Sequence, residues 1–190
     1  MQFALSRPDI VRAISQRWLL KLWKRHTGAD RLPSWKILEE ENLSSMMAKV
    51  SFLDVVGTGE TTRFKIRYNG PIIGRAYGSV DCAGKFLDET IPANRYADAR
   101  KPYRRVVDSA RPVYMVHDVT DRNGTLVHYE RLLLPFADDG KTVNRILAAF
   151  EFICPDGNFE AQNLMKSPSA PPSLRLAATI EPQARPGLQA

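Results

Sequence analysis

Two β-rich runs and a polar turn make up residues 125–153, TLVHYERLLLPFADDGKTVNRILAAFEFI. The two runs, with Gly140 in the turn between them, predict a long antiparallel hairpin. The second run is apolar on both faces, so we expect a central strand that is covered on both sides. Pro135 cannot donate a hydrogen bond to a ladder and is expected to end the pairing of the first strand. The rest of the chain is expected to pack around this hairpin.

The first run of the hairpin alternates along the predicted strand. His128 and Glu130 face one way, and Tyr129 and Arg131 face the other. A carboxylate beside an imidazole can perform acid–base chemistry, so His128 and Glu130 form one candidate pair. A structural pair on the sheet is the favoured interpretation, because no nucleophile motif or Gly-rich phosphate loop accompanies it. We therefore expect that the protein is not an enzyme.

The composition narrows the class of protein. The chain has 190 residues, 44% of them hydrophobic, which suits one domain with tails. No apolar run approaches the ~18 residues of a membrane span. Arg12, Arg17 and Lys21 interrupt the N-terminal apolar residues, which argues against a signal peptide and for a cytoplasmic protein. The two cysteines, Cys82 and Cys154, are too few for a disulfide framework or a zinc site.

The net charge of +6 is unevenly distributed along the chain. Residues 1–30 hold six Lys or Arg against two Asp, so this segment carries a charge of +4. A positive segment of this kind can contact nucleic acid or an acidic membrane surface. A solvated helix face is the favoured interpretation, because no nucleic-acid motif accompanies the charge.

Residues 7–25 predict an N-terminal amphipathic helix. Pro8 is tolerated in a first turn, and Gly28 closes the segment. Its apolar stripe at helical spacing comprises Val11, Ile14, Trp18 and Leu22. The stripe packs either on its own domain or against a second copy of the chain, and both alternatives stay open. These four residues are therefore the candidate interface of a homodimer.

The pattern of the remaining chain predicts a single α+β domain over residues 31–154, between an N-terminal segment at 1–30 and a tail at 155–190. Further strands are expected at 49–56, 62–68 and 113–119, and helices at 34–43, 72–78, 94–100 and 102–110. This order predicts one five-stranded antiparallel sheet with helices on one face and a small cavity between them. The tail is rich in proline and poor in aromatic residues, so it is expected to be flexible.

The order of these elements resembles the PAS domain. Local sequence narrows the resemblance to a PAS-like family that is common as single-domain proteins in alphaproteobacteria. The segments that carry it are WLLKLW at 18–23, RLPS at 31–34, RYNG at 67–70, GKFLD at 84–88 and YERLLLP at 129–135. The resemblance covers roughly residues 15–153. It implies a sensory or protein-interaction module whose partners are a small-molecule ligand, a signalling protein, or both.

PAS domains often hold heme, flavin or a small organic acid, and this sequence favours neither heme nor flavin. Heme needs an axial ligand, usually histidine, but His117 and His128 lie on predicted strands. Imidazoles on strands more often pair with a backbone or carboxylate group. The segment DCAGKFLD at 81–88 only loosely matches the reactive-cysteine motif of photosensory flavin domains, because its cysteine is displaced and the flanking Asn and Gln are missing. No cofactor and no metal site are therefore predicted.

The candidate ligand-binding residues come from the strand and helix positions expected to face the cavity. They are Phe64, Ile66, Tyr68, Tyr103, Met115, His117, His128 and Phe150. Arg67 alternates outward, and a salt bridge on the solvent face is its favoured role. If the alternation slips by one residue, Arg67 would instead point inward, where it could bind a carboxylate.

The favoured function is a cytoplasmic PAS-type sensory or regulatory module that dimerises through its N-terminal helix. One alternative is a small α+β enzyme that uses His128 and Glu130. The other is a basic nucleic-acid adaptor that uses the N-terminal helix.

Overall fold

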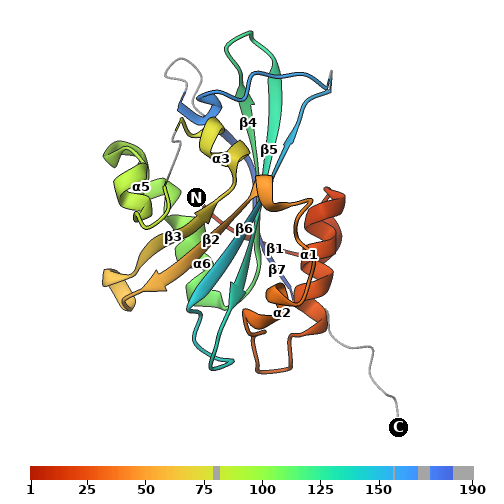
Figure 1. Cartoon of the computed structure of the whole chain (residues 1–190), viewed down its shortest axis with the longest axis vertical. Coiled ribbons are helices and arrows are strands. Elements are labelled where there is room, and N and C mark those ends of the chain that lie inside the picture. Colours follow the sequence, from red (N-terminus) through yellow and green to blue (C-terminus); the bar gives the residue numbers. More distant parts are fainter. Residues whose placement is uncertain (79–81, 156, 167–171, 182–190) are drawn as a thin grey trace.

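A computed structural model describes residues 1–78, 82–155, 157–166 and 172–181. Within them the chain forms one seven-stranded sheet in the order β1-β7-β4-β5-β6-β2-β3 (Figure 1). The strands are β1 (Ala4–Ser6), β2 (Val50–Val56), β3 (Arg63–Asn69), β4 (Val113–Thr120), β5 (Leu126–Phe136), β6 (Arg145–Ile153) and β7 (Ser173–Ile180). The helices are α1 (Ile14–Arg25), α2 (Lys36–Glu39), α3 (Pro71–Ala76), α4 (Leu87–Thr90), α5 (Ala93–Ala99) and α6 (Lys101–Ser109). Short 3-10 turns include η2 (Met47–Lys49), η3 (Gly59–Thr61) and η4 (Leu164–Lys166).

The long antiparallel hairpin of β5 and β6 is present, and its strands lie in the middle of the sheet. The prediction for Pro135 is wrong, because pairing with β6 continues through Pro135 to Phe136. The neighbouring strand β4 ends opposite Leu133, so the missing N–H of Pro135 faces a position that no strand occupies. The Pro135 carbonyl, on that same side, accepts a hydrogen bond of 2.6 Å from the indole Nε1 of Trp23.

The prediction of a five-stranded sheet is wrong, because two further strands join it beside β4. β7 comes from the segment expected to be a flexible tail, and it pairs antiparallel with β4. β1 pairs parallel with β7 at the edge of the sheet. The side chains of Ala177, Ala178 and Ile180 are buried there. A small apolar run thus satisfies the backbone groups of β4 that a five-stranded sheet would leave unpaired.

Helices cover both faces of the sheet, and not one face as predicted. α3, α5 and α6 lie on one side, and α1 and α2 lie on the other (Figure 1). The apolar character of β5 and β6 on both faces requires this second layer. The N-terminal helix begins at Ile14 rather than at residue 7, after a short 3-10 turn at Pro8–Ile10. It is anchored to the sheet by Gln16, whose amide donates to the Ala149 carbonyl at 3.0 Å.

A β-bulge changes which side chains of β3 face the α3–α6 layer. Pairing between β2 and β3 shifts between Phe52, opposite Tyr68, and Leu53, opposite Ile66, so Arg67 is the extra residue. Ile66 therefore faces α3–α6, whereas Tyr68 turns to the other face and packs at a tilt against Phe52, with 5.4 Å between the ring centroids. The expectation that Tyr68 points toward the cavity is wrong for this reason.

Candidate functional site: a cavity between the sheet and helices α3–α6

A cavity of about 350 Å³ lies between the sheet and the layer formed by α3–α6 and η4. Its floor is built from β2 to β6, and its roof contains residues from α3, α4, α5, α6 and η4. The apolar part of the wall includes Leu53, Ile66, Ile73, Leu87, Ile91 and Phe150. Cys82 also lines the cavity as a buried free thiol. The volume lies at the lower end of the range that small-molecule sites occupy.

Five of the eight predicted cavity residues line this space. They are Ile66, Tyr103, Met115, His117 and Phe150. Phe64 is fully buried beside the cavity and packs on Tyr103, with 5.3 Å between the ring centroids. Tyr68 lies on the opposite face, where its hydroxyl donates to the Met47 carbonyl at 3.0 Å.

His128 also lies on the face opposite to the cavity. Side chains alternate along β5, and Tyr129 and Arg131 are the ones that line the cavity. Its Nδ1 lies 2.7 Å from Asp118 Oδ1, directly across the β4–β5 ladder. Glu130 is 2% exposed on the same face as His128. His128 is therefore paired with Asp118, and neither member of the predicted acid–base pair lines the cavity.

Arg131 is the cavity residue that the sequence analysis did not select. It lies on the central strand β5 and is only 6% exposed. Its Nη1 donates to the Tyr103 hydroxyl at 3.4 Å, and its Nη2 lies 3.2 Å from the Met115 sulfur. Its Nε has no hydrogen-bond partner among the described residues. The alternation of β5 had placed Arg131 on the same face as Tyr129, and this was the signal available in the sequence.

Three further polar groups surround Arg131. The hydroxyls of Tyr77 and Tyr129 lie 2.8 Å apart and share one hydrogen bond. Burial raises the pKa of both hydroxyls, so they stay neutral. Burial and the nearby charge of Arg131 lower the pKa of His117 to about 4. His117 is therefore a neutral imidazole at neutral pH, and no group in the described part of the chain forms a hydrogen bond with its Nδ1.

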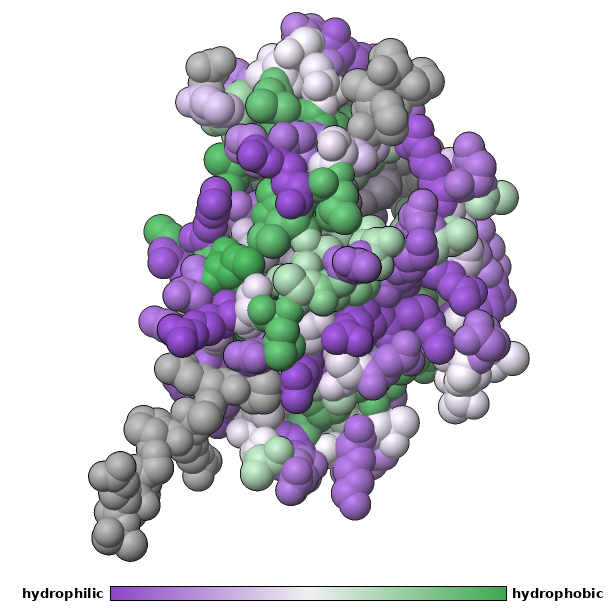
Figure 2. All heavy atoms as spheres, turned by 180° about the vertical axis from the view of Figure 1, so that it is seen from behind, coloured by the Kyte–Doolittle hydropathy of each residue, from purple (hydrophilic) through white to green (hydrophobic). Residues whose placement is uncertain are grey.

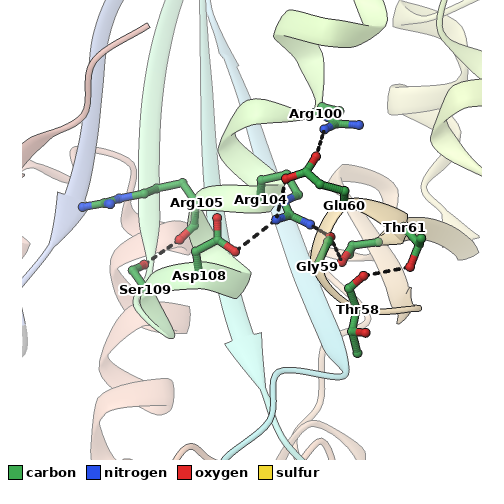
Figure 3. Close-up of polar contacts among 10 residues, drawn as sticks. Thr58, Gly59, Glu60, Thr61, Arg100, Arg104, Arg105, Asp108 and Ser109 are labelled. Atoms are coloured by element: carbon green, nitrogen blue, oxygen red, sulfur yellow. Dashed lines mark hydrogen bonds and ion pairs between the residues drawn. The ribbon is translucent and has the colours of Figure 1, made fainter.

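A polar cluster joins the outer side of α5 and α6 to the turn between β2 and β3 (Figure 3). Arg104 donates to the Gly59 carbonyl, and it pairs with Asp108 at 3.5 Å. Glu60 lies 3.3 Å from Arg100 and 4.0 Å from Arg104. Each exposed ion pair contributes little alone, but together they hold the helices against the hairpin. This cluster supports the cavity layer from outside.

The predicted dimer residues divide between the core and the surface. Val11 and Leu22 are buried within the chain, at 0% and 1% exposure, so they are not free to contact a second copy. Ile14 is 77% exposed, and Trp18 packs half-buried against the core. Figure 2 shows the face opposite to the one seen in Figure 1, and hydrophobic residues, coloured green, gather near its middle. A dimer contact through Ile14 and Trp18 stays a prediction.

None of the helices formed by the described residues is long and apolar enough to cross a membrane.

A mainly antiparallel sheet, a layer of short helices and a cavity between them define an α+β domain. Residues 74–152, from within α3 to near the end of β6, match the family model described as PAS fold. This match supports a PAS-type domain in that part of the chain. The finer resemblance of the chain to the alphaproteobacterial family stays a prediction.

Two solved structures are similar to this chain. A variant of RsLOV is 16% identical with a TM-score of 0.41, and the match covers 60% of this chain and 65% of that one. The Rhodobacter sphaeroides LOV protein is 14% identical with a TM-score of 0.42, covering 76% of this chain and 72% of that one. The chain thus spans slightly less than two thirds of the RsLOV chain. No curated protein matches the sequence.

Proposed function

We propose that the protein is a sensory module that binds a small molecule in the cavity under α3–α6 and reports its presence to a partner protein. The observation that carries this proposal is the cavity itself. A mostly apolar wall surrounds a few convergent polar groups, namely Arg131, His117 and the Tyr77–Tyr129 pair. Pockets that recognise small molecules commonly combine these two features.

The cavity roof offers a route from ligand to partner. α4 and α5 are short helices of four and seven residues, and the described side chains of α5 include no buried residue. Such elements gain order when a ligand fills the space below them. The cluster of Arg100, Arg104 and Glu60 lies beside them, at the end of α5, on α6 and in η3, so a shift of the roof would change a charged surface. That surface is where we place the contact with a signalling protein.

A pair of variants on α5 tests the proposal. Ala99 lines the cavity, whereas Ala97 lies exposed on the same helix. Ala99→Phe would fill part of the cavity, and Ala97→Phe adds the same side chain outside it. Thermal unfolding of wild type and both variants is measured against a library of small metabolites. We expect compounds that stabilise wild type and Ala97→Phe but not Ala99→Phe. Stabilisation of all three proteins to the same extent would contradict a ligand site in this cavity.

The proposal retains a homodimer formed through the outer side of α1. Ile14→Glu places a charge on its most exposed apolar side chain. Light scattering is expected to report a monomer for this variant and a dimer for wild type. Ile153→Glu, at a less exposed position on β6, is the control. A dimer mass for Ile14→Glu, equal to that of wild type, would contradict a dimer formed through this side of α1.

A further inference from the structure

A second hollow, a groove of about 600 Å³, lies on the outer side of helices α5 and α6. It is bounded by the two helices, by the turn between β2 and β3, and by the residues that precede β1. The groove is more open to solvent than the cavity under the helices. Phe3 and Tyr96 give its wall aromatic surface, and both are half-buried. An open groove with apolar surface suits a segment of another protein better than it suits an enclosed small molecule.

The charged side chains that line the groove are mostly cations. The cations are Arg100, Lys101, Arg104 and Arg105, and the carboxylates are Glu60 and Asp108. The two carboxylate side chains pair with Arg100 and Arg104, yet they are 88% and 57% exposed. Exposed pairs of this kind exchange partners at little cost. The cations still exceed the carboxylates when Asp98, the partner of Lys101, is included, so the groove is net positive.

Arg105 is the groove cation that lacks a carboxylate partner within the described part of the chain. None of the ion pairs formed by the described residues includes its guanidinium. Its Nε donates to Thr179 Oγ1 at 2.9 Å, and Thr179 is fully buried in β7. Figure 3 shows the Arg105 side chain extending away from Arg104 and Glu60. The guanidinium is thus held in place at Nε, while its charge is left to pair with an anion from outside.

Helix α5 lies between the groove and the cavity. On one side of the helix, at helical spacing, the cavity is lined by Arg95, Asp98 and Ala99. On the other side, the groove is lined by Ala93 and Tyr96, and by Arg100 directly after the helix. A molecule in the cavity that shifts α5 therefore also changes the wall of the groove.

We propose that the groove receives an acidic segment of the partner protein, in which carboxylates flank an apolar side chain. The carboxylates pair with Arg105 and Arg100, and the apolar side chain packs between Phe3 and Tyr96. This inference rests on the proposed function, because it names the chemistry of the partner to which the module reports. Because α5 borders both sites, a ligand in the cavity changes the affinity of the groove for this segment.

Nucleic acid fits the groove less well than an acidic protein segment does. A continuous phosphate backbone would lie against the exposed carboxylates of Glu60 and Asp108, which repel it. A protein segment can place separate carboxylates opposite the cations and leave apolar side chains between them. The mixture of charges and aromatic surface in the groove matches this second pattern.

The test measures the binding of synthetic peptides to the full chain by fluorescence anisotropy. The main probe is a fluorescein-labelled peptide in which glutamates flank two leucines. Comparison probes replace the glutamates with glutamine or the leucines with serine, and a single-stranded oligothymidylate represents nucleic acid. The groove variant combines Arg100→Gln with Arg105→Gln. The matched control combines Lys65→Gln with Arg67→Gln, which removes two exposed cations of β3 that do not line the groove.

We expect the glutamate–leucine peptide to bind wild type more tightly than either comparison peptide does, and its binding should weaken with added salt. The groove variant should bind this peptide about 10-fold more weakly, whereas the control variant should stay within about twofold of wild type. Any compound that the metabolite screen identifies should change the affinity of wild type for the same peptide.

Equal binding of the glutamate and glutamine peptides to wild type would overturn the proposal. This comparison uses no variant, so it decides even if the groove variant fails to fold. Equal losses in the groove and control variants would also overturn it, because the attraction would then belong to the net charge of the whole chain. Tighter binding of the oligothymidylate would replace the protein segment with nucleic acid. All three results leave the ligand site in the cavity standing, and that site fails separately if the metabolite screen finds no ligand.

Discussion

The neutral state of His117 predicts a specific dependence of stability on pH. In the folded chain burial and the charge of Arg131 lower the pKa of His117 to about 4, from an ordinary value of 6.5. Below pH 6.5 the unfolded chain therefore binds a proton that the folded chain does not. Stability contributed by this neutral imidazole is fully present above pH 6.5 and is lost as the pH falls toward 4.

The size of the effect follows from these two pKa values. Between pH 8 and pH 5 the linkage predicts that His117 alone removes about 2 kcal/mol from the free energy of unfolding. Other groups also titrate in this interval, so the loss of unfolding free energy in wild type is compared with the loss in a variant that lacks His117. His117→Phe cannot take up the proton, and it keeps a flat ring beside Tyr129, whose ring centroid lies 5.9 Å from that of His117.

Urea unfolding at pH 8 and pH 5 measures this difference. We expect wild type to lose about 2 kcal/mol more than His117→Phe when the pH falls. His26→Phe, which changes an exposed loop histidine, should follow wild type. Parallel losses in wild type and His117→Phe would refute the reasoning, because they would mean that His117 takes up its proton equally in both states.

Three further predictions concern stability. Gly70→Ala should lower the free energy of unfolding by about 1–3 kcal/mol, because a Cβ there would lie 2.5 Å from two backbone oxygens of η2. Urea unfolding measures this loss, and Gly28→Ala is the control, because a Cβ at that position would come no closer than 3.3 Å to a neighbouring atom. Trp23→Phe should cost about 1–2 kcal/mol by the same assay, since it removes the buried hydrogen bond to the Pro135 carbonyl. Removal of residues 173–190 should lower the unfolding temperature and promote aggregation in light scattering, because it exposes the edge of β4; an unchanged protein would contradict the role of β7.

The parts of the fold that local sequence specifies were predictable. The β5–β6 hairpin follows from two β-rich runs around a turn, and α6 begins where Pro102 fits a first helical turn. β7 could not be predicted in the same way. It is a short apolar run inside a proline-rich segment, and it becomes a strand only because β4 offers an edge more than 50 residues away in the sequence.

The candidate site was harder to predict because it depends on register between strands. His128 was expected in the cavity together with His117, but pairing places His128 opposite Asp118, on the other face from His117. Tyr68 left the cavity through the bulge at Arg67, which simple alternation does not reveal. Arg131 was on the correct face in the sequence analysis. Arg131 was not among the candidate residues, and only the structure shows that its strand is paired on both sides and that its side chain is buried.

The central claim is that a small molecule occupies the cavity under α3–α6. A native mass spectrum of the full chain tests it most directly, when the protein is purified under gentle conditions and compared with Ala99→Phe. We expect a discrete added mass on wild type that is released on denaturation and is reduced or absent on Ala99→Phe. The bare chain mass for wild type, or the same added mass on both proteins, would contradict the claim.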